Sequence, residues 1–264
     1  MRIVLTNDDG FDAPGLAALW QAVRLLGDDV EIDVIAPALP QSGKGHTFSE
    51  QVRIWQTETA VIGSVLVVDG SPTDCACVAG CHPEKPRPDW LIAGINRGSN
   101  LGIDVYASGT VAAARQAAIL GIPSVAVSQL VYKDQDDDWA RSARETTAVL
   151  AALIHPGTPA PDHSDPTIHR LVTEAVTQKR SIHTNSTPCW NVNLPRLPDD
   201  QPTQAVKYAL LSHDPVRLEY ELTSLEDGSR QFVYVGNYHR RPVAPGTDVE
   251  ATFKGAIAIS LLPL

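Results

Sequence analysis

The sequence predicts an α/β protein whose mostly parallel sheet is covered by helices on both faces and is followed by a C-terminal extension of short strands. Two observations indicate this fold class. From residue 1 to about 130, short β-branched runs alternate with apolar residues at helical spacing, as in repeated βαβ units. From about residue 189 onward, only short strand-like runs remain. The 264 residues suffice for one large core, so a single domain over 1–264 is expected.

The first βαβ unit has the clearest pattern. Strands are expected around residues 3–5 and 34–35, where β-branched and leucine side chains follow one another. The helix between them is indicated by apolar residues that share one face: Leu16, Leu19, Trp20, Val23 and Leu26. Asp12 could cap the start of this helix, and Gly27 is placed to end it.

The remaining elements of the core over 1–130 and its flanking helix follow in order. Strands are expected at residues 65–68, 90–95 and 124–128, and helices after Ser71-Pro72, over 108–120 and over 139–154. The continuous apolar run 90–95 suits the centre of a parallel sheet. Ser71 offers a capping hydroxyl, and proline is favoured at the first helical position that follows it. The acidic run 134–138 is expected to be a solvated cap rather than a metal site.

The second half of the chain has a different character. Residues 131–188 are expected to hold one helix and a variable loop region, because proline, glycine and small polar residues cluster over 155–165. Residues 189–264 are expected to form short antiparallel strands or hairpins and a final strand that returns to the core. These strands are expected over 206–211, 218–222, 232–235 and 255–262.

The composition limits what the protein can bind. The chain carries 31 acidic and 21 basic residues, a formal net charge of −10, so its surface is unsuited to nucleic-acid polymers. A phosphorylated substrate would need a local positive charge. The first residues form an alternating strand rather than a signal peptide, and no apolar run is long enough to cross a bilayer. A soluble, cytoplasmic protein without membrane association is therefore expected.

The cysteines give no sign of a disulfide framework. They are Cys75, Cys77, Cys81 and Cys189, and they do not form two CxxC pairs. The first three fall within one expected helix. Buried thiols in a reducing cytosol are therefore expected rather than a zinc site.

An acidic pair follows the first expected strand. Asp8 and Asp9, in the tetrapeptide Asn7-Asp8-Asp9-Gly10, stand at the carboxyl end of that strand, where open α/β sheets bind their ligands. Two adjacent carboxylates repel one another unless a cation lies between them, and Mg²⁺ and Mn²⁺ prefer such oxygen ligands. The same tetrapeptide could equally be a turn before the next helix. The motif alone leaves both interpretations open.

Polar loops after other strands offer partners for the acidic pair. Asn96 ends the expected central strand, and its amide oxygen could complete a metal shell without adding charge. Ser42 lies in the glycine-bearing loop 41–47 after the second strand. Such neutral ligands would leave a cation with net positive charge for a phosphate. His46 and Lys44 of the same loop could meet negative charge or protonate a leaving oxygen, although a histidine in such a loop could be structural.

A helix start lies at the same edge of the sheet. The run from Tyr106 to Val111 opens the alanine-rich helix, so unsatisfied N–H groups and the positive end of the helix dipole would form a phosphate cradle. Ser108 could also be no more than an N-cap. The candidate substrate and phosphate contacts are Ser42, Gly43, Lys44, Asn100, Ser108, Gly109 and Thr110.

Several stretches together resemble one known family. They are Ile3–Leu16, Ser42–Ser49, Val68–Cys75, Asp89–Ser128, Trp190–Pro195 and Pro245–Val249, and they span nearly the whole chain. The combination of NDDG, SGxGH, GINRGSN and SGTVAAAR is far more specific than any one of these motifs. It resembles the SurE family of stationary-phase survival proteins, which are metal-dependent 5′/3′-nucleotidases.

The resemblance implies a Rossmann-like three-layer core and a C-terminal β-hairpin that mediates homodimers and, in some members, homotetramers. It implies one divalent cation per subunit, Mg²⁺ or Mn²⁺, with Asp8, Asp9, Ser42 and Asn96 as ligands. It also implies that Ser108, Gly109 and Thr110 line the phosphate side of the pocket. Substrates of the family are nucleoside 5′- or 3′-monophosphates and, for some members, short polyphosphate. Lys44 departs from a position that is often small, and residues 130–188 have no firm counterpart.

The expected reaction is that of a 5′-nucleotidase, in which metal-activated water attacks phosphorus. The catalytic candidates are Asp8, Asp9, Asn96 and His46. One alternative makes Asp8 a nucleophile that forms an aspartyl-phosphate. The other is a non-catalytic Mg²⁺-binding receiver or nucleotide sensor, although a receiver needs an aspartate where Asn96 stands.

Overall fold

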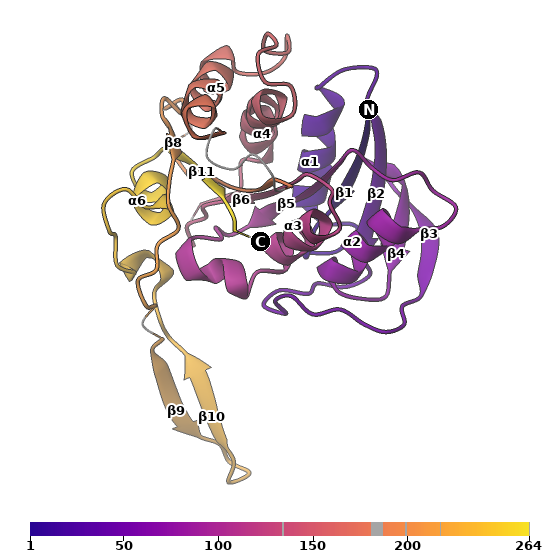
Figure 1. The fold of residues 1–264 in the computed structure, drawn as a ribbon. Coiled ribbons are helices and arrows are strands. Elements are labelled where there is room, and N and C mark those ends of the chain that lie inside the picture. The colour runs from indigo at the N-terminus through magenta and orange to yellow at the C-terminus, as the bar shows by residue number, and fades with distance from the viewer. Residues whose placement is uncertain (134, 181–186, 199, 217, 264) are drawn as a thin grey trace.

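The computed structural model describes residues 1–133, 135–180, 187–198, 200–216 and 218–263 (Figure 1). Within these ranges the main sheet has nine strands, in the order β3-β4-β2-β1-β5-β6-β7-β11-β8, and β9 and β10 form a separate hairpin. The strands are β1 (Arg2–Thr6), β2 (Glu31–Pro37), β3 (Ile54–Thr59), β4 (Gly63–Val68), β5 (Trp90–Arg97), β6 (Ser124–Gln129), β7 (Cys189–Leu194), β8 (Val206–Tyr208), β9 (Tyr220–Ser224), β10 (Arg230–Tyr234) and β11 (Ile257–Leu261). The helices are α1 (Pro14–Arg24), α2 (Pro72–Cys81), α3 (Gly109–Ile119), α4 (Trp139–Ile154), α5 (Pro166–Arg180) and α6 (Asp248–Phe253), with 3-10 helices η1 (Gly102–Tyr106) and η2 (Tyr238–Arg240).

The centre of the sheet is parallel. β1 pairs with β2 on one side and with β5 on the other, and β6 and β7 continue the parallel run beyond β5. The antiparallel pairs are β3 with β4 and β7 with β11. The carboxyl ends of the parallel strands therefore meet at one edge of the sheet. The predicted α/β class with a mostly parallel sheet is confirmed.

Helices cover both faces of the sheet, which makes three layers (Figure 1). α1, α4 and α5 pack together on one face, while α2 and α3 pack together on the other. The predicted apolar stripe of α1 is buried, since Leu16, Leu19 and Val23 belong to the main core cluster together with Ile3 and Leu5 of β1. This packing fixes the carboxyl end of β1 at the centre of the molecule.

Three predicted helix caps are present. The Ser71 hydroxyl accepts the Asp74 N–H at 3.1 Å, and the Asp74 carboxylate accepts the Ser71 N–H at 2.7 Å, so α2 opens with a capping box. The Ser108 hydroxyl caps α3, and Asp138 caps α4. α4 begins and ends where the sequence predicted.

The expectation that Asp12 caps the first helix is wrong. The N-cap is Ala13, whose side chain makes no capping bond, and the helix begins at Pro14. Proline has no N–H to be capped and its fixed φ suits the first helical position, so this helix starts without a polar cap.

Two strands, β3 and β7, and two helices, α5 and α6, have no counterpart in the prediction, and one strand pairs differently. β3 is an edge strand with polar and exposed residues, and β7 has asparagines between its apolar residues. α5 is largely polar, but it buries Ile168, Val172 and Val176 in the main core cluster. β8 was expected to be antiparallel, but it pairs in parallel with β11, Val206 opposite Ile257. The long connection between these two strands, which includes the hairpin and α6, allows the chain to return in the same direction.

The β9–β10 hairpin extends away from the rest of the molecule (Figure 1). Tyr220 stacks on Phe232 across the hairpin with ring centroids 4.3 Å apart, and Tyr220 also meets Tyr234 edge-on. All residues of both strands are exposed. Among the helices of the described ranges, none combines the length and the apolar character needed to cross a membrane.

Candidate active site

Four segments converge at the carboxyl edge of the parallel sheet. The end of β1 carries Asp8 and Asp9, and β1 lies between β2 and β5 in the sheet. The loop after β2 reaches the pair, since the Gln41 N–H donates to the Asp8 carbonyl at 2.7 Å. The Asp9 carboxylate accepts the backbone N–H of Arg97 at the end of β5. The start of α3 completes the site, because Thr110 donates a hydrogen bond from its hydroxyl to Asp8.

Asp8 is a buried carboxylate. Its residue is only 4 % exposed, and its Oδ1 accepts the Thr110 hydroxyl. Burial raises the pKa of Asp8 to about 6, the hydrogen bond from Thr110 opposes that rise, and the neighbouring Asp9 adds to it. When it is ionised, a carboxylate buried in this way is stabilised by a cation that binds beside it.

Asp9 is half-buried beside the end of β5. Burial raises the pKa of Asp9, while the Arg97 N–H and the positive charge of Arg97 lower it. The Arg97 guanidinium itself is turned to Asp137, with Nε 2.6 Å from Oδ2. Arg97 thus acts on Asp9 mainly through its main chain, which leaves the carboxylate available to a ligand.

The loop after β2 carries the candidate neutral ligand Ser42. The Gly45 N–H donates to the Ala107 carbonyl at 3.0 Å, so the loop is fixed to the segment just before α3 as well as to Asp8. Gly43 has φ +73°, a conformation that side chains disfavour, and no atom lies within 4 Å of where a Cβ would stand. Ser42 and Lys44 are exposed on either side of it.

Asn96 stands at the end of β5, next to the residue that binds Asp9. Its Nδ2 donates to the Gly98 carbonyl at 2.7 Å, which leaves Oδ1 as the atom suited to a ligand. Asn96 is half-buried and lies opposite Ser128 of β6 in the sheet register. The structure therefore places all four predicted ligands on segments that meet at this edge.

The N-terminus of α3 lies directly against Asp8. A Cβ on Gly109 would stand 2.8 Å from the Asp8 Cβ, closer than real Cβ contacts, so a glycine is needed here. Ser108 accepts the Val111 N–H at 3.0 Å, as a capping hydroxyl does. The hydroxyls of Ser108 and Thr110 are thus used by the protein itself. The Ser108 N–H donates to the Asp104 carbonyl at 3.0 Å and the Thr110 N–H donates to Asp8, so the Gly109 N–H is the group of this turn suited to a phosphate.

Asn100 stabilises the loop after β5. Its Nδ2 donates to the Ser128 hydroxyl at 2.7 Å, and its N–H donates to Oδ1 of Asn193 at 2.9 Å. Its carbonyl accepts from the side chains of Asn191 and Asn193 of β7. The sequence reasoning did not assign the two β7 asparagines, although their i, i+2 spacing places them on one face of a strand.

His46 is held by a residue that the sequence reasoning did not single out. Its Nε2 lies 2.8 Å from Oε1 of Gln116, in the second half of α3. The sequence separation of 70 residues explains why no local pattern points to this pair. Lys44 has no such fixed partner among the interactions of the described residues.

The donor set fits a hard divalent cation. In the described ranges no lysine or arginine forms an ion pair with Asp8, although this carboxylate is buried. The buried Oδ1 of the adjacent Asn7 also lacks a hydrogen-bond partner there. The described residues hold no cluster of three or more His, Cys, Asp or Glu for a metal. A cation at Asp8 and Asp9 would thus rely on neutral oxygens such as those of Ser42 and Asn96 to complete its shell.

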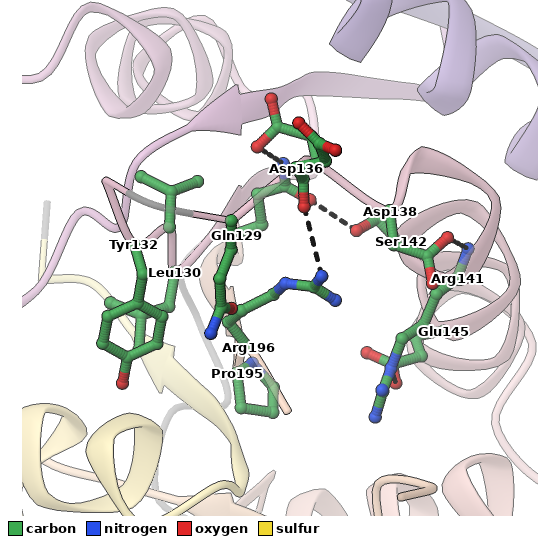
Figure 2. A pocket seen from close by; sticks show the side chains of 13 residues that line it. Gln129, Leu130, Tyr132, Asp136, Asp138, Arg141, Ser142, Glu145, Pro195 and Arg196 are labelled. Atoms are coloured by element: carbon green, nitrogen blue, oxygen red, sulfur yellow. Dashed lines mark hydrogen bonds and ion pairs between the residues drawn. The ribbon is translucent and has the colours of Figure 1, made fainter. Parts of the chain in front are cut away.

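A second pocket lies beside this edge but is too small for a nucleotide. Figure 2 shows it between the end of β6, the loop over 135–138 and the start of α4. Its volume of about 10 Å³ gives room for a single water. Several of its polar groups are already paired, since Ser142 donates to Gln129 at 2.5 Å and Arg141 contacts Glu145 at 2.9 Å. This pocket is a structural polar cluster.

The fold and this edge define an α/β protein with an acidic, oxygen-lined site beneath a helix N-terminus at the carboxyl end of a parallel sheet. A family model described as "Survival protein SurE" matches residues 3–216. The chain belongs to the SurE family.

Relatives extend this likeness over the whole chain. A protein of Synechocystis is 36 % identical over 262 residues, which cover 99 % of both chains. The protein named "5'-nucleotidase SurE" of Geotalea uraniireducens is 33 % identical, over 100 % of this chain and 93 % of its own. The one of the same name from Caulobacter vibrioides is 32 % identical, over 99 % and 90 %. The crystal structure of the SurE protein from Aquifex aeolicus has the same fold, with a TM-score of 0.73, 24 % identity and coverage of 99 % and 93 %.

Proposed function

We propose that this protein is a divalent-metal-dependent phosphomonoesterase that hydrolyses nucleoside 5′- and 3′-monophosphates. The observation that carries the proposal is the buried Asp8, which forms no ion pair with a lysine or arginine of the described ranges and lies under the first turn of α3. A carboxylate and a phosphate can share this space only if a cation lies between them. The 5′-nucleotidase names of the relatives support a nucleotide as substrate.

Asp8, Asp9, Ser42 and Asn96 would hold the cation, one per subunit, with Mg²⁺ and Mn²⁺ as the ions that suit oxygen ligands. When bound, such an ion polarises a phosphoryl group and lowers the pKa of water, so that the water loses a proton more readily and becomes a better nucleophile toward phosphorus. The two neutral oxygens add no negative charge to that of the two carboxylates, so the cation can still attract electrons from a phosphoryl oxygen.

The protein's own groups would orient the phosphate. The N–H of Gly109, at the positive end of α3, binds one of its oxygens, whereas the Ser108 N–H already donates to the Asp104 carbonyl at 3.0 Å and the Thr110 N–H donates to Asp8. Lys44, exposed on its loop, adds a charge that can approach the same phosphate. His46 is held through Nε2, so its other ring nitrogen is the atom that can exchange a proton with the substrate.

The test is phosphate release from nucleoside 5′-monophosphates, 3′-monophosphates and short polyphosphate, with Mg²⁺, Mn²⁺ or chelator. The wild type should release phosphate only with a cation, and Asp8→Asn and Asp9→Asn should each lose at least about a hundredfold in kcat/KM. Near-native turnover of both variants would refute the metal site. A phosphoenzyme trapped on Asp8 would instead favour the aspartyl-phosphate route.

We also infer that the protein is a homodimer built through the β9–β10 hairpin. Tyr220, Leu222 and Phe232 are exposed apolar side chains on a segment that packs against none of the core clusters. Apolar side chains gathered on one projecting element are typical of an interface. A second copy of the chain is the partner that the family resemblance favours.

A further inference from the structure

A chain of polar contacts runs from the His46 loop through α3 to α2. His46 Nε2 lies 2.8 Å from Oε1 of Gln116. The side-chain amide of Gln116 also hydrogen-bonds to the thiol of Cys77. With Oε1 accepting the ring N–H, the amide nitrogen donates to the Cys77 sulfur. Gln116 thus has both ends of its amide engaged and links a candidate catalytic histidine to a thiol.

Cys77 opens to solvent through a groove beside α2. The groove has a volume of about 530 Å³, and its lining includes Cys77, Cys81, Val52 and Ile54. Cys81 is exposed and Cys77 is half-buried. The two cysteines stand one helical turn apart, so they share a face of α2. A small molecule in the groove can therefore reach a sulfur whose other side contacts Gln116.

We propose that Cys77 is a modification site for low-molecular-weight disulfides, and that its modification displaces Gln116 from His46 and so inhibits the enzyme. Gln116 is in this view a positioning residue for His46. The proposal rests on the proposed function, because it gives His46 a part in that reaction.

The chemistry is a balanced thiol–disulfide exchange. The Cys77 thiol loses its proton, and its sulfur attacks one sulfur of the small disulfide. The S–S bond of the reagent breaks, a new S–S bond forms at Cys77, and the other half leaves as a thiolate that takes up the proton. No further oxidant is needed, and an added thiol reverses the reaction.

The other cysteines differ from Cys77 in access or in contact. Cys75 and Cys189 are fully buried, which protects them in the folded protein. Cys81 is exposed and should react first. Burial and the neighbouring Cys81 raise the pKa of Cys77, so this thiol reacts more slowly, and faster as the pH rises.

Modification of Cys77 has a direct route to His46. The added group must fit where α2 and α3 pack together. Because this interface is closely packed, the extra volume displaces neighbouring side chains. The modified sulfur also carries new volume beside the Gln116 amide. Gln116 is the side chain that must move, and His46 then loses its partner at Nε2.

The experiment uses the full-length protein and S-methyl methanethiosulfonate, which places a methylthio group on thiols and does not bind hard cations. Mass spectrometry should show a fast phase at Cys81 and a slow phase at Cys77. Phosphate release from a nucleoside monophosphate should persist through the fast phase and fall at least about tenfold with the slow phase. Dithiothreitol should restore it. The matched variants are Cys81→Ala, which should keep the slow loss, and Cys77→Ala, which should resist it.

Two further measurements test directly whether Cys77 acts on His46 through Gln116, apart from the loss of activity. Nitrogen-15 NMR of the His46 ring should show a changed Nε2 signal once Cys77 is modified. Gln116→Leu should lower kcat more than KM and make the enzyme insensitive to Cys77 modification, while Gln116→Glu, which keeps an acceptor for His46, should restore kcat.

The outcomes decide the proposal either way. Full modification of Cys77 with unchanged activity and an unchanged His46 signal would overturn it, as would a Cys77 that stays unmodified while the protein is folded. If the unmodified wild type released no phosphate from nucleotides, the proposed function would fail, and the NMR signal would still decide whether Cys77 acts on His46.

Discussion

Thr110 donates its hydroxyl to Oδ1 of Asp8, and this hydrogen bond joins residues 102 positions apart. It connects the first turn of α3, the predicted phosphate cradle, to the predicted metal ligand at the end of β1. Thr110 is fully buried, so this contact is shielded from water. Because hydrogen bonds to charged groups are stronger than neutral ones, the contact also favours the ionised form of Asp8.

Thr110→Val should weaken cation binding. Valine keeps the shape of the side chain but removes the donor, so the pKa of Asp8 should rise further and protons should compete better with the cation. One hydrogen bond to a charged group corresponds to about a tenfold loss in Mn²⁺ affinity at neutral pH. Calorimetric titration with Mn²⁺ measures it, and Thr110→Ser, which keeps the hydroxyl, is the control. Equal affinity of the valine variant and the wild type would show that this contact does not support the site.

Asp8→Asn should stabilise the metal-free protein while it removes activity. The pKa of Asp8 is about 6 in the fold, above the ordinary value of 3.8. Its contribution to the free energy of unfolding is therefore fully present below about pH 4 and is lost as the pH rises to about 6. At neutral pH the ionised, buried Asp8 costs up to about 3 kcal/mol, which asparagine avoids.

Urea unfolding in the presence of chelator, at pH 4 and at pH 7.5, tests this expectation. The stability gain of Asp8→Asn should appear at pH 7.5 and be small at pH 4. Addition of Mn²⁺ should stabilise the wild type and not the variant, because ligand binding to the folded state adds to its stability. A variant less stable than the wild type at pH 7.5 without metal would contradict the burial argument.

Gly109→Ala should disrupt the site by contact alone. The added Cβ would stand 2.8 Å from the Asp8 Cβ and 3.1 Å from Cγ of Pro72, so the first turn of α3 must shift. Overpacking of this kind costs about 1–3 kcal/mol of stability, and phosphate release should fall about a hundredfold because the donors move. Gly43→Ala is the contrasting variant, since no atom lies within 4 Å of its Cβ. A Gly109→Ala variant with native stability and native phosphate release would show that this close contact with Asp8 does not constrain the site.

The parallel core could be predicted because its signals are local. The apolar stripe of α1, the Ser71 cap of α2 and the Ser108 cap of α3 each depend on residues within a few positions of one another. The order of strands then places Asp8 and Asn96 at one edge without further information. Ser42 was reached from the glycine-bearing loop after the second strand, and the motif combination then supported that assignment.

The contacts that complete the site join distant residues, and no periodicity encodes them. Thr110 to Asp8 and Gln116 to His46 depend on how α3 packs over β1 and over the loop after β2. β7 escaped prediction because Asn191 and Asn193 stand among its apolar residues, and their amides are used to hold the loop at Asn100. The two asparagines that hold the loop at Asn100 thus interrupt the apolar pattern from which β7 could have been predicted.

Substitution on the hairpin should separate the subunits without unfolding them. Phe232 is 65 % exposed and stacks on Tyr220 of the same hairpin, so Phe232→Glu removes apolar surface and adds charge where a second copy would pack. The wild type should sediment as a dimer and the variant as a monomer, with the melting temperature of the core nearly unchanged at low protein concentration. Gln231→Ala, the neighbouring residue on the opposite face of β10, is the matched control and should remain dimeric. A dimeric Phe232→Glu variant would place the subunit interface elsewhere on the molecule.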